Sequence, residues 1–198
     1  MSEFGNVTLS DVEAAQARVY ALAVRTPLLP SAVLSEQVGA EVLLKAEVLQ
    51  RTGSFKVRGA ANRIGQLTDQ ERRAGVVTAS AGNHAQGVAL AAARLGVPGT
   101  IVMPREASLA KVEATRRYGA EVVLEGSDFA EAAEHARKLA AERGLVFVPA
   151  FDDPLVIAGQ GTVGLEILEE PDMPPPQEFV PEPEFMGELR APQIGLGD

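Results

Sequence analysis

The segment Val76-Val77-Thr78-Ala79-Ser80-Ala81-Gly82-Asn83-His84-Ala85-Gln86-Gly87 contains a strand, a small polar loop and the start of a helix in succession. The same alternation continues through apolar β-branched runs at 101–102, 122–124 and 146–148. Glycines at 96, 119 and 144 stand where the intervening helices should stop. Strands that are apolar on both faces and alternate with helices predict a parallel sheet with right-handed crossovers. We therefore predict an α/β fold with open parallel sheets and flanking helices.

Local signals place further elements on either side of this pattern. Ser10 and Glu13 form an S-x-x-E capping box, which predicts a helix from near Ser10 to about Val24. Asp128 and Glu131 should cap the helix before Gly144, with an apolar stripe of Phe129, Ala132, Ala133, Ala136 and Ala140. The other expected elements are an extended segment at 26–27, a strand at 42–44, a helix over 54–66 and a helix over 153–170 opened by Asp153-Pro154.

Composition excludes several classes of protein. The chain has 198 residues, 46% apolar and 23% charged, which is typical of a globular protein. It has no cysteine and only two histidines, His84 and His135, so we expect no disulfide and no metal site. A net charge of −9 argues against nucleic-acid binding. No apolar run is long enough for a membrane span, and we expect a cytoplasmic protein.

The character of the chain changes at Pro171. The segment from Pro171 to Asp198 contains six acidic residues, one arginine and seven of the thirteen prolines. Proline disrupts both helix and sheet, so we expect 171–198 to be a disordered acidic tail. A parallel α/β pattern requires another apolar strand at this point, and its absence suggests a truncated gene or a shifted reading frame.

A lysine with reactive potential lies in Gly53-Ser54-Phe55-Lys56-Val57-Arg58-Gly59-Ala60. A lysine on the first turn of a helix can form an imine with an aldehyde when its amine is neutral, and burial or a positive helix end lowers its pKa. The neighbouring Phe55 could cover one face of a bound ring. The alternative is a solvated surface lysine, which is the commoner state of any single lysine.

The segment Ser80-Ala81-Gly82-Asn83-His84 follows a strand and opens a helix. Ligands of open α/β sheets bind at the carboxyl ends of strands, and free N–H groups at a helix start bind anions. This position suits a carboxylate, with Ser80 and Asn83 as side-chain donors. The alternative is that Ser80 or Asn83 only caps the helix.

Together, the two motifs resemble the fold-type-II pyridoxal-phosphate enzymes of the threonine dehydratase and serine racemase family. The first motif extends over Lys45 to Ala60 as K-x-E-x-L-Q-x-T-G-S-F-K-x-R-G-A, and the second reads S-A-G-N-H-A-Q-G. Segments 26–28, 119–122 and 159–166 match as well, so the resemblance covers about residues 10–170. It implies a two-domain, tryptophan-synthase-β-like architecture truncated in its larger domain. The implied parts are 1–52 of the larger domain, a smaller domain over 53–150, a returning helix over 151–170 and the tail over 171–198.

The resemblance also implies roles for individual residues. Lys56 is the catalytic residue and holds pyridoxal 5'-phosphate as an aldimine, Phe55 packs on the pyridine ring, and Asn83 bonds the ring hydroxyl. Ser80, Gly82, Asn83 and His84 line the site of the substrate carboxylate. His84 has an alternative role as a satisfied residue on the inner face of its helix, and we expect its backbone N–H to matter more than its imidazole. The family's phosphate-binding loop and its partner for the pyridine nitrogen have no counterpart here.

The implied reaction is the deamination of L-threonine, or L-serine, by a dehydratase, with 2-oxobutanoate and ammonia as products from threonine. Serine racemases carry a second serine where this chain has Ala81. Racemisation needs acid/base groups on both faces of the substrate, so Ala81 favours the dehydratase. A racemase-like enzyme and an inactive, non-enzymatic remnant are the alternatives. The resemblance further implies a small hydroxy-amino-acid substrate and a homo-oligomer.

Gly159, Gly161 and Gly164 also spell G-x-G-x-x-G, the fingerprint of dinucleotide binding. We give this interpretation little weight, because a helix start rather than a strand precedes these glycines.

Overall fold

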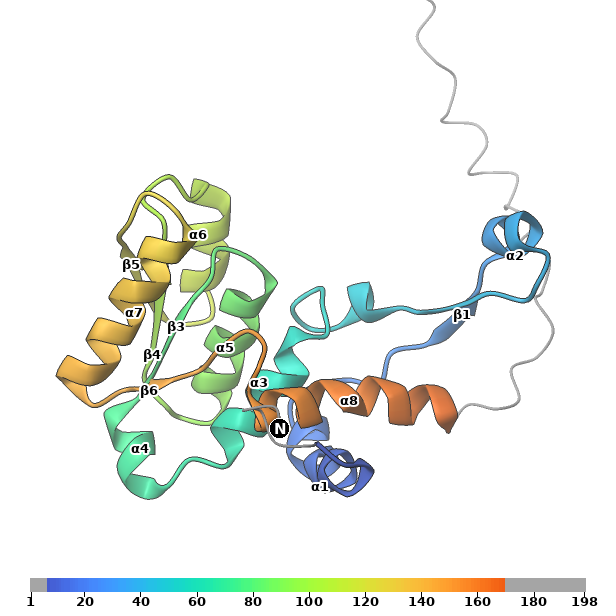
Figure 1. Ribbon diagram of the computed structural model, residues 1–198, viewed down its shortest axis with the longest axis horizontal. Helices are drawn as coiled ribbons and strands as arrows, with labels where there is room; N and C mark the ends of the chain where they lie inside the picture. Colours follow the sequence, from blue (N-terminus) through green and yellow to red (C-terminus); the bar gives the residue numbers. More distant parts are fainter. Residues whose placement is uncertain (1–6, 170–198) are drawn as a thin grey trace, which may run out of the picture.

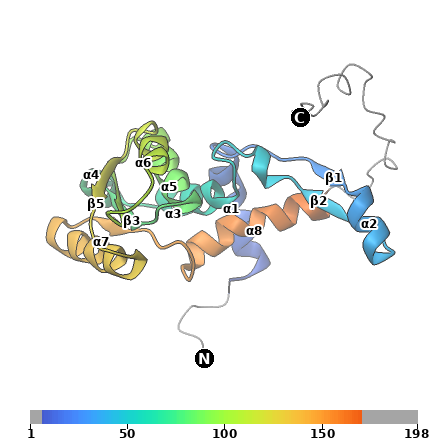
Figure 2. The same cartoon turned by 90° about the horizontal axis from the view of Figure 1, so that it is seen from above.

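The computed structural model describes residues 7–169. A lobe built on a parallel sheet lies at one end, and an arm formed by an antiparallel strand pair and a short helix extends from it (Figures 1 and 2). Helix α8 (Pro154–Leu168) leaves the lobe and runs below the arm in Figure 1. Within the described residues, no helix is long and apolar enough to cross a membrane.

The lobe contains the predicted parallel sheet, in the order β5-β4-β3-β6. Its strands are β3 (Val76–Ala79), β4 (Gly99–Met103), β5 (Glu121–Leu124) and β6 (Val146–Phe147). All three pairings are parallel, with Val76 opposite both Gly99 and Val146. The prediction of an α/β fold with a parallel sheet is thus confirmed.

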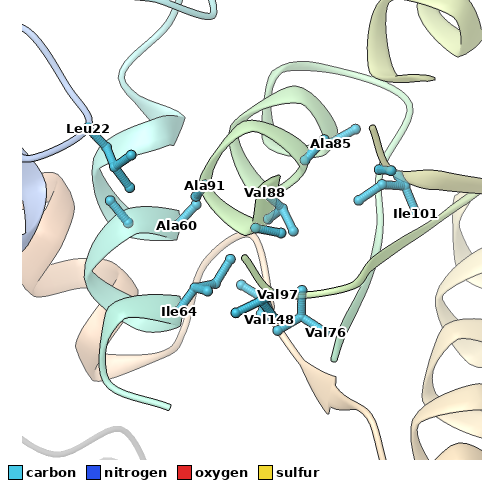
Figure 3. Packing of buried hydrophobic residues seen from close by; sticks show 14 of the residues in the cluster. Leu22, Ala60, Ile64, Val76, Ala85, Val88, Ala91, Val97, Ile101 and Val148 are labelled. Carbon is cyan, nitrogen blue, oxygen red and sulfur yellow. The ribbon is translucent and has the colours of Figure 1, made fainter. Parts of the chain in front are cut away.

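Alternating residues of the strands pack on opposite faces of the sheet. Val76 and Ile101 contact the layer of α5 (Asn83–Arg94), while Val77 and Val102 contact α7 (Phe129–Arg143). Figure 3 shows the first face, where side chains of α5 lie between the sheet and α3 (Lys56–Gly65). The lobe is completed by α4 (Asp69–Ala74) and α6 (Leu109–Arg116). Burial on both faces explains why these strands read as continuous apolar runs.

The arm consists of β1 (Leu28–Pro30), α2 (Ala32–Val38) and β2 (Leu43–Lys45), followed by the 3-10 turn η1 (Glu47–Leu49). β1 and β2 pair antiparallel, with Leu29 opposite Leu44. At the base of the arm, α1 (Leu9–Tyr20) packs with α3 and α8 around a small core that includes Val19, Val57 and Ala158. The strand at 42–44 was predicted within one residue, whereas β1 and α2 were not predicted.

Three details of the predicted helices are wrong. α1 ends at Tyr20 and not near Val24. α1 is capped by Thr8 and Asp11, whose side chains and backbone N–H groups bond reciprocally, and not by Ser10 and Glu13. Thr8 has the extended backbone that an N-cap requires, so the helix begins earlier than expected. Phe129 does not join the buried stripe of α7, because it occupies the first helical position and is 52% exposed. Asp128 does cap α7 by accepting a hydrogen bond from Glu131 N at 3.0 Å.

The G-x-G-x-x-G glycines lie inside α8, and Gly159 and Gly161 allow close helix packing. A Cβ at Gly159 would lie 2.7 Å from the carbonyl oxygen of Arg58 and 2.7 Å from Cα of Gly59. A Cβ at Gly161 would lie 2.8 Å from the Val12 side chain. The contacts explain these two glycines through the crossing of α8 with α3 and α1, and the dinucleotide interpretation is wrong. The predicted tail over 171–198 lies outside the described residues, and the proposed domain boundaries remain predictions.

Candidate cofactor and carboxylate site

Lys56 occupies the first position of α3, directly after the N-cap residue Phe55. Its Nζ donates a hydrogen bond of 2.8 Å to the carbonyl oxygen of Ala150 and lies 5.2 Å from the centre of the Phe55 ring. Burial lowers the pKa of Lys56 below its ordinary value. A lowered pKa increases the fraction of neutral amine, which is the form that attacks a carbonyl carbon.

The loop after β3 leads into α5 without a side-chain cap. Gly82 is the N-cap residue and offers no side-chain acceptor, so the first N–H groups of α5 remain available. Ser80 Oγ accepts a hydrogen bond of 3.1 Å from Gly82 N, which stabilises the turn. The alternative that Ser80 or Asn83 caps the helix is therefore wrong. Asn83 is exposed at the first helical position.

Helices α3 and α5 approach each other closely next to the lysine. A Cβ at Gly87 would lie 3.0 Å from the carbonyl carbon of Lys56 and 3.0 Å from Val57 N. This contact brings the second turn of α5 against the first turn of α3. The two motifs, separated by about 20 residues of sequence, therefore meet in space because residue 87 has no side chain.

The segment after β6 contacts both motifs. His84 Nε2 lies 3.1 Å from the carbonyl oxygen of Val148, and Ala150 accepts the bond from Lys56. Because a carbonyl oxygen can only accept, Nε2 of His84 carries the hydrogen in this contact. His84 is 3% exposed, and burial lowers its pKa to about 4 despite the Val148 carbonyl, so the ring is neutral at neutral pH. The imidazole thus lies buried on the inner face of its helix and is bonded through Nε2, whereas its Nδ1 has no hydrogen-bond partner in the described part of the chain, so the expected satisfied residue is found only in part.

Sequence reasoning overlooked a cluster of buried charges beside the lysine. Lys45, Glu47 and Arg58 all belong to the K-x-E…K-x-R motif, yet no role follows for them from the sequence alone. In the structure they form ion pairs with one another or with Glu166 of α8. The charged residues of the motif could have indicated such a cluster. Their partner Glu166 could not be predicted, because it lies more than 100 residues further along the chain than Arg58.

These features fit a ligand that carries an aldehyde and a substrate that carries a carboxylate. Lys56 supplies a half-buried amine, and the uncapped start of α5 supplies N–H donors beside it. The hydroxyl of Ser54, two residues before Lys56, is buried and has no hydrogen-bond partner in the described part of the chain. It is a further donor that a bound molecule could satisfy.

Comparison with known proteins agrees with this chemistry. A family model described as "Pyridoxal-phosphate dependent enzyme" matches residues 19–181. The match covers most of the chain, and the protein belongs to this family of pyridoxal-phosphate dependent enzymes.

Within the family, the chain is similar to threonine ammonia-lyases and to serine racemases. An L-threonine ammonia-lyase of Thermotoga maritima is 56% identical over 168 residues, which are 84% of this chain and 42% of the relative. The structure of threonine deaminase isoform 2 from Solanum lycopersicum superposes with a TM-score of 0.78 at 47% identity, over 82% of this chain and 44% of that one. Maize serine racemase superposes with a TM-score of 0.79 at 38% identity, over 83% and 50%. The chain thus spans about half the length of these relatives.

Proposed function

We propose that this chain carries the lysine and carboxylate-binding part of a threonine dehydratase, which converts L-threonine to 2-oxobutanoate and ammonia. The observation that carries the proposal is the half-buried Lys56 amine with a lowered pKa, held next to the uncapped start of α5. The identity of 56% to a threonine ammonia-lyase supports the choice of substrate. Ala81 in the loop supports elimination over racemisation, because it has no proton to exchange on the second face.

Lys56 has two tasks in this proposal. Its neutral amine would hold the cofactor through the aldehyde group, and as a free amine it would take the proton from the substrate Cα. Pyridoxal phosphate, when bound, supplies an electron sink for the carbanion at that carbon. The carbonyl oxygen of Ala150 orients the lysine Nζ before either event.

The start of α5 orients the substrate. Backbone N–H groups of Asn83 and His84, with the Ser80 hydroxyl, are the donors we assign to the substrate carboxylate, since they lie at a positive helix end. Gly82 lines the same site, with its own N–H bonded to Ser80 Oγ. We assign Asn83 to the ring hydroxyl of the cofactor and Phe55, which is 40% exposed, to one face of its ring. His84 contributes through its backbone, because its imidazole is held by Val148.

The proposal is tested by covalent labelling. The 198-residue protein is incubated with pyridoxal phosphate and reduced with borohydride, and the modified peptide is located by mass spectrometry. We expect the label on Lys56 and its loss in Lys56→Ala, while Lys138→Ala, which removes a lysine whose side chain is 68% exposed, keeps it. A label spread over the surface lysines would contradict the assignment. Release of 2-oxobutanoate from L-threonine, compared with formation of D-serine from L-serine, separates the dehydratase from the racemase.

We further propose that copies of this chain associate through the arm. Large apolar side chains are exposed along it: Leu29, Val33, Val38, Leu44, Val48 and Leu49. An isolated two-stranded sheet is only marginally stable in water, and an apolar surface of this kind favours burial against another subunit. This surface is the observation that supports a homo-oligomer.

A further inference from the structure

Four charged side chains form a buried cluster around Arg58, which lies two residues after Lys56 on α3. Arg58 donates from Nε and Nη2 to the two carboxylate oxygens of Glu47, at 2.9 and 2.7 Å. It donates from Nη1 and Nη2 to the two oxygens of Glu166, at 2.6 and 3.0 Å. Lys45 Nζ lies 3.0 Å from Glu166. We call Lys45, Glu47, Arg58 and Glu166 the ion cluster; the side chains of Arg58 and Glu166 are 0% exposed.

The ion cluster joins segments that are distant in sequence. Lys45 belongs to β2, Glu47 to η1, Arg58 to α3 and Glu166 to α8. The ion cluster therefore connects the arm, helix α3 and helix α8 at one point. Arg58 uses both edges of its guanidinium, and such fork-to-carboxylate pairs constrain orientation as well as distance.

The pair of Glu47 and Arg58 also closes the loop that carries Lys56. Within that loop, the Gln50 side chain binds the backbone of Val24 through two hydrogen bonds, at 2.9 and 2.8 Å. Gly53 turns the chain with a φ of 68°, and Lys56 follows at the first position of α3. Both ends of this short loop are thus held, and the direction in which α3 starts depends on them.

The charges of the ion cluster balance, with two cations and two carboxylates. Burial acts to lower the pKa of Arg58, but the hydrogen bonds that Arg58 donates to Glu47 and Glu166 outweigh it and the net pKa is raised. Burial acts to raise the pKa of Glu166, but Arg58 and Lys45 lower it overall. Arg58 and Glu166 therefore stay charged at neutral pH. A buried ion network is weak evidence of stabilisation, whereas its use in fixing a unique geometry is better attested.

We infer that the ion cluster is a positioning device for Lys56: it orients the first turn of α3 so that the Lys56 amine meets the segment after β6. This inference rests on the proposed role of Lys56 as the cofactor lysine. Arg58 and Glu47 are positioning residues that do not touch the cofactor. The contact they secure is the bond from Lys56 Nζ to the Ala150 carbonyl, at 2.8 Å.

Arg58→Lys tests this role, since lysine keeps the charge and loses the planar fork. Glu47→Asp is a milder second variant that keeps the charge and shortens the side chain, and it decides the question if Arg58→Lys does not fold. Arg63→Lys is the matched control. Arg63 also lies on α3 and pairs with Asp153 at the start of α8, at 3.2 Å, but it is further from Lys56 along the helix.

Two readouts are measured on folded protein, well below each melting temperature. The first is the rate at which Lys56 is labelled by pyridoxal phosphate and borohydride. The second is the pH profile of Lys56 acetylation by acetic anhydride, with the exposed Lys138 as internal reference. We expect labelling to slow by about tenfold or more in Arg58→Lys and Glu47→Asp, because small misplacements of a reacting group have effects of that size. The acetylation profile of Lys56 should shift in the same two variants and not in Arg63→Lys.

The results distinguish the positioning role of the ion cluster from the proposed role of Lys56 as the cofactor lysine. If the wild type is labelled at Lys56 and the folded variants are labelled at the same rate with unchanged profiles, the ion cluster is only structural and the inference is overturned. If the wild type is not labelled at Lys56, the proposed function fails. In that case the acetylation profiles decide alone: a shift confined to the two cluster variants supports positioning, and unchanged profiles overturn it.

Discussion

Gly87 of α5 lies against the peptide bond that joins Lys56 to Val57. A Cβ at residue 87 would lie 3.0 Å from both the Lys56 carbonyl carbon and Val57 N, closer than side chains normally approach backbone. The absence of a side chain at this position therefore allows α3, which carries Lys56, and α5 to meet.

Gly87→Ala should weaken this contact. The neighbours of the added methyl are backbone atoms that cannot rotate away, so we expect a loss of about 1–3 kcal/mol in the free energy of unfolding. Labelling of Lys56 by pyridoxal phosphate should fall as well. Gly164→Ala is the control, because Gly164 lies in α8 with nothing within 4 Å of an added Cβ. It should be neutral or stabilise by about 0.5–1 kcal/mol. Urea unfolding of both variants checks the prediction, and equal effects would contradict it.

Acid should destabilise the fold through His84. Its pKa falls from 6.5 to about 4 on burial, so below pH 6.5 the unfolded state binds the proton more readily than the folded state. The stabilisation is complete above about pH 6.5 and is lost as pH falls toward 4. By pH 5 the loss should reach about 2 kcal/mol, before most carboxylates titrate.

Urea unfolding of the wild type and of His84→Gln between pH 7 and pH 5 measures this effect. We expect His84→Gln to be less stable at pH 7 but to vary less with pH over that range. A wild-type stability that stays constant down to pH 5 would mean that His84 is not held as a buried neutral ring.

Asp153 should stabilise the start of α8 mainly as an N-cap. Its Oδ1 accepts from Leu155 N and Val156 N, both at 2.9 Å, while Oδ2 pairs with Arg63. Asp153→Ala should cost about 1–2 kcal/mol in the free energy of unfolding. Asp153→Asn keeps the cap and loses only the ion pair, so it should cost about 0–1 kcal/mol. Thermal or urea unfolding distinguishes the two variants, and an equal cost would assign the stabilisation to the ion pair.

The arm should control association. Val33 and Val48 are 67% and 76% exposed, so charged replacements there disturb no core. The double variant Val33→Glu, Val48→Glu should sediment as a smaller species than the wild type while keeping its secondary structure. Analytical ultracentrifugation measures this difference, and the same double change at the exposed Leu109 and Phe129 of the lobe serves as a control. Equal sedimentation of wild type and arm variant would exclude the arm as the interface.

Much of the fold could be predicted because its signals are local. A buried parallel strand is apolar on both faces, so the apolar runs at 76–77, 101–102 and 146–148 predict strands. Asp153-Pro154 marks a helix start because an N-cap carboxylate and a proline at the first turn both suit free N–H groups. Lys56 and the Ser80–His84 loop lie at helix starts, but their proposed roles come from the resemblance to the family and not from these local signals.

The remaining features depend on contacts between distant residues. β1 is a strand that pairs with β2, and Phe129 is exposed although its spacing fits the apolar stripe of α7. Arg58 and Glu166 are 108 residues apart in the chain, and no local pattern predicts that they share two hydrogen bonds. The sequence by itself determined the strands of the parallel sheet and several helix starts, since these follow from propensity and capping, and the resemblance to the family singled out Lys56. Only the tertiary structure decided how that lysine is oriented, because burial, charge pairing and close helix contact arise when distant segments pack together.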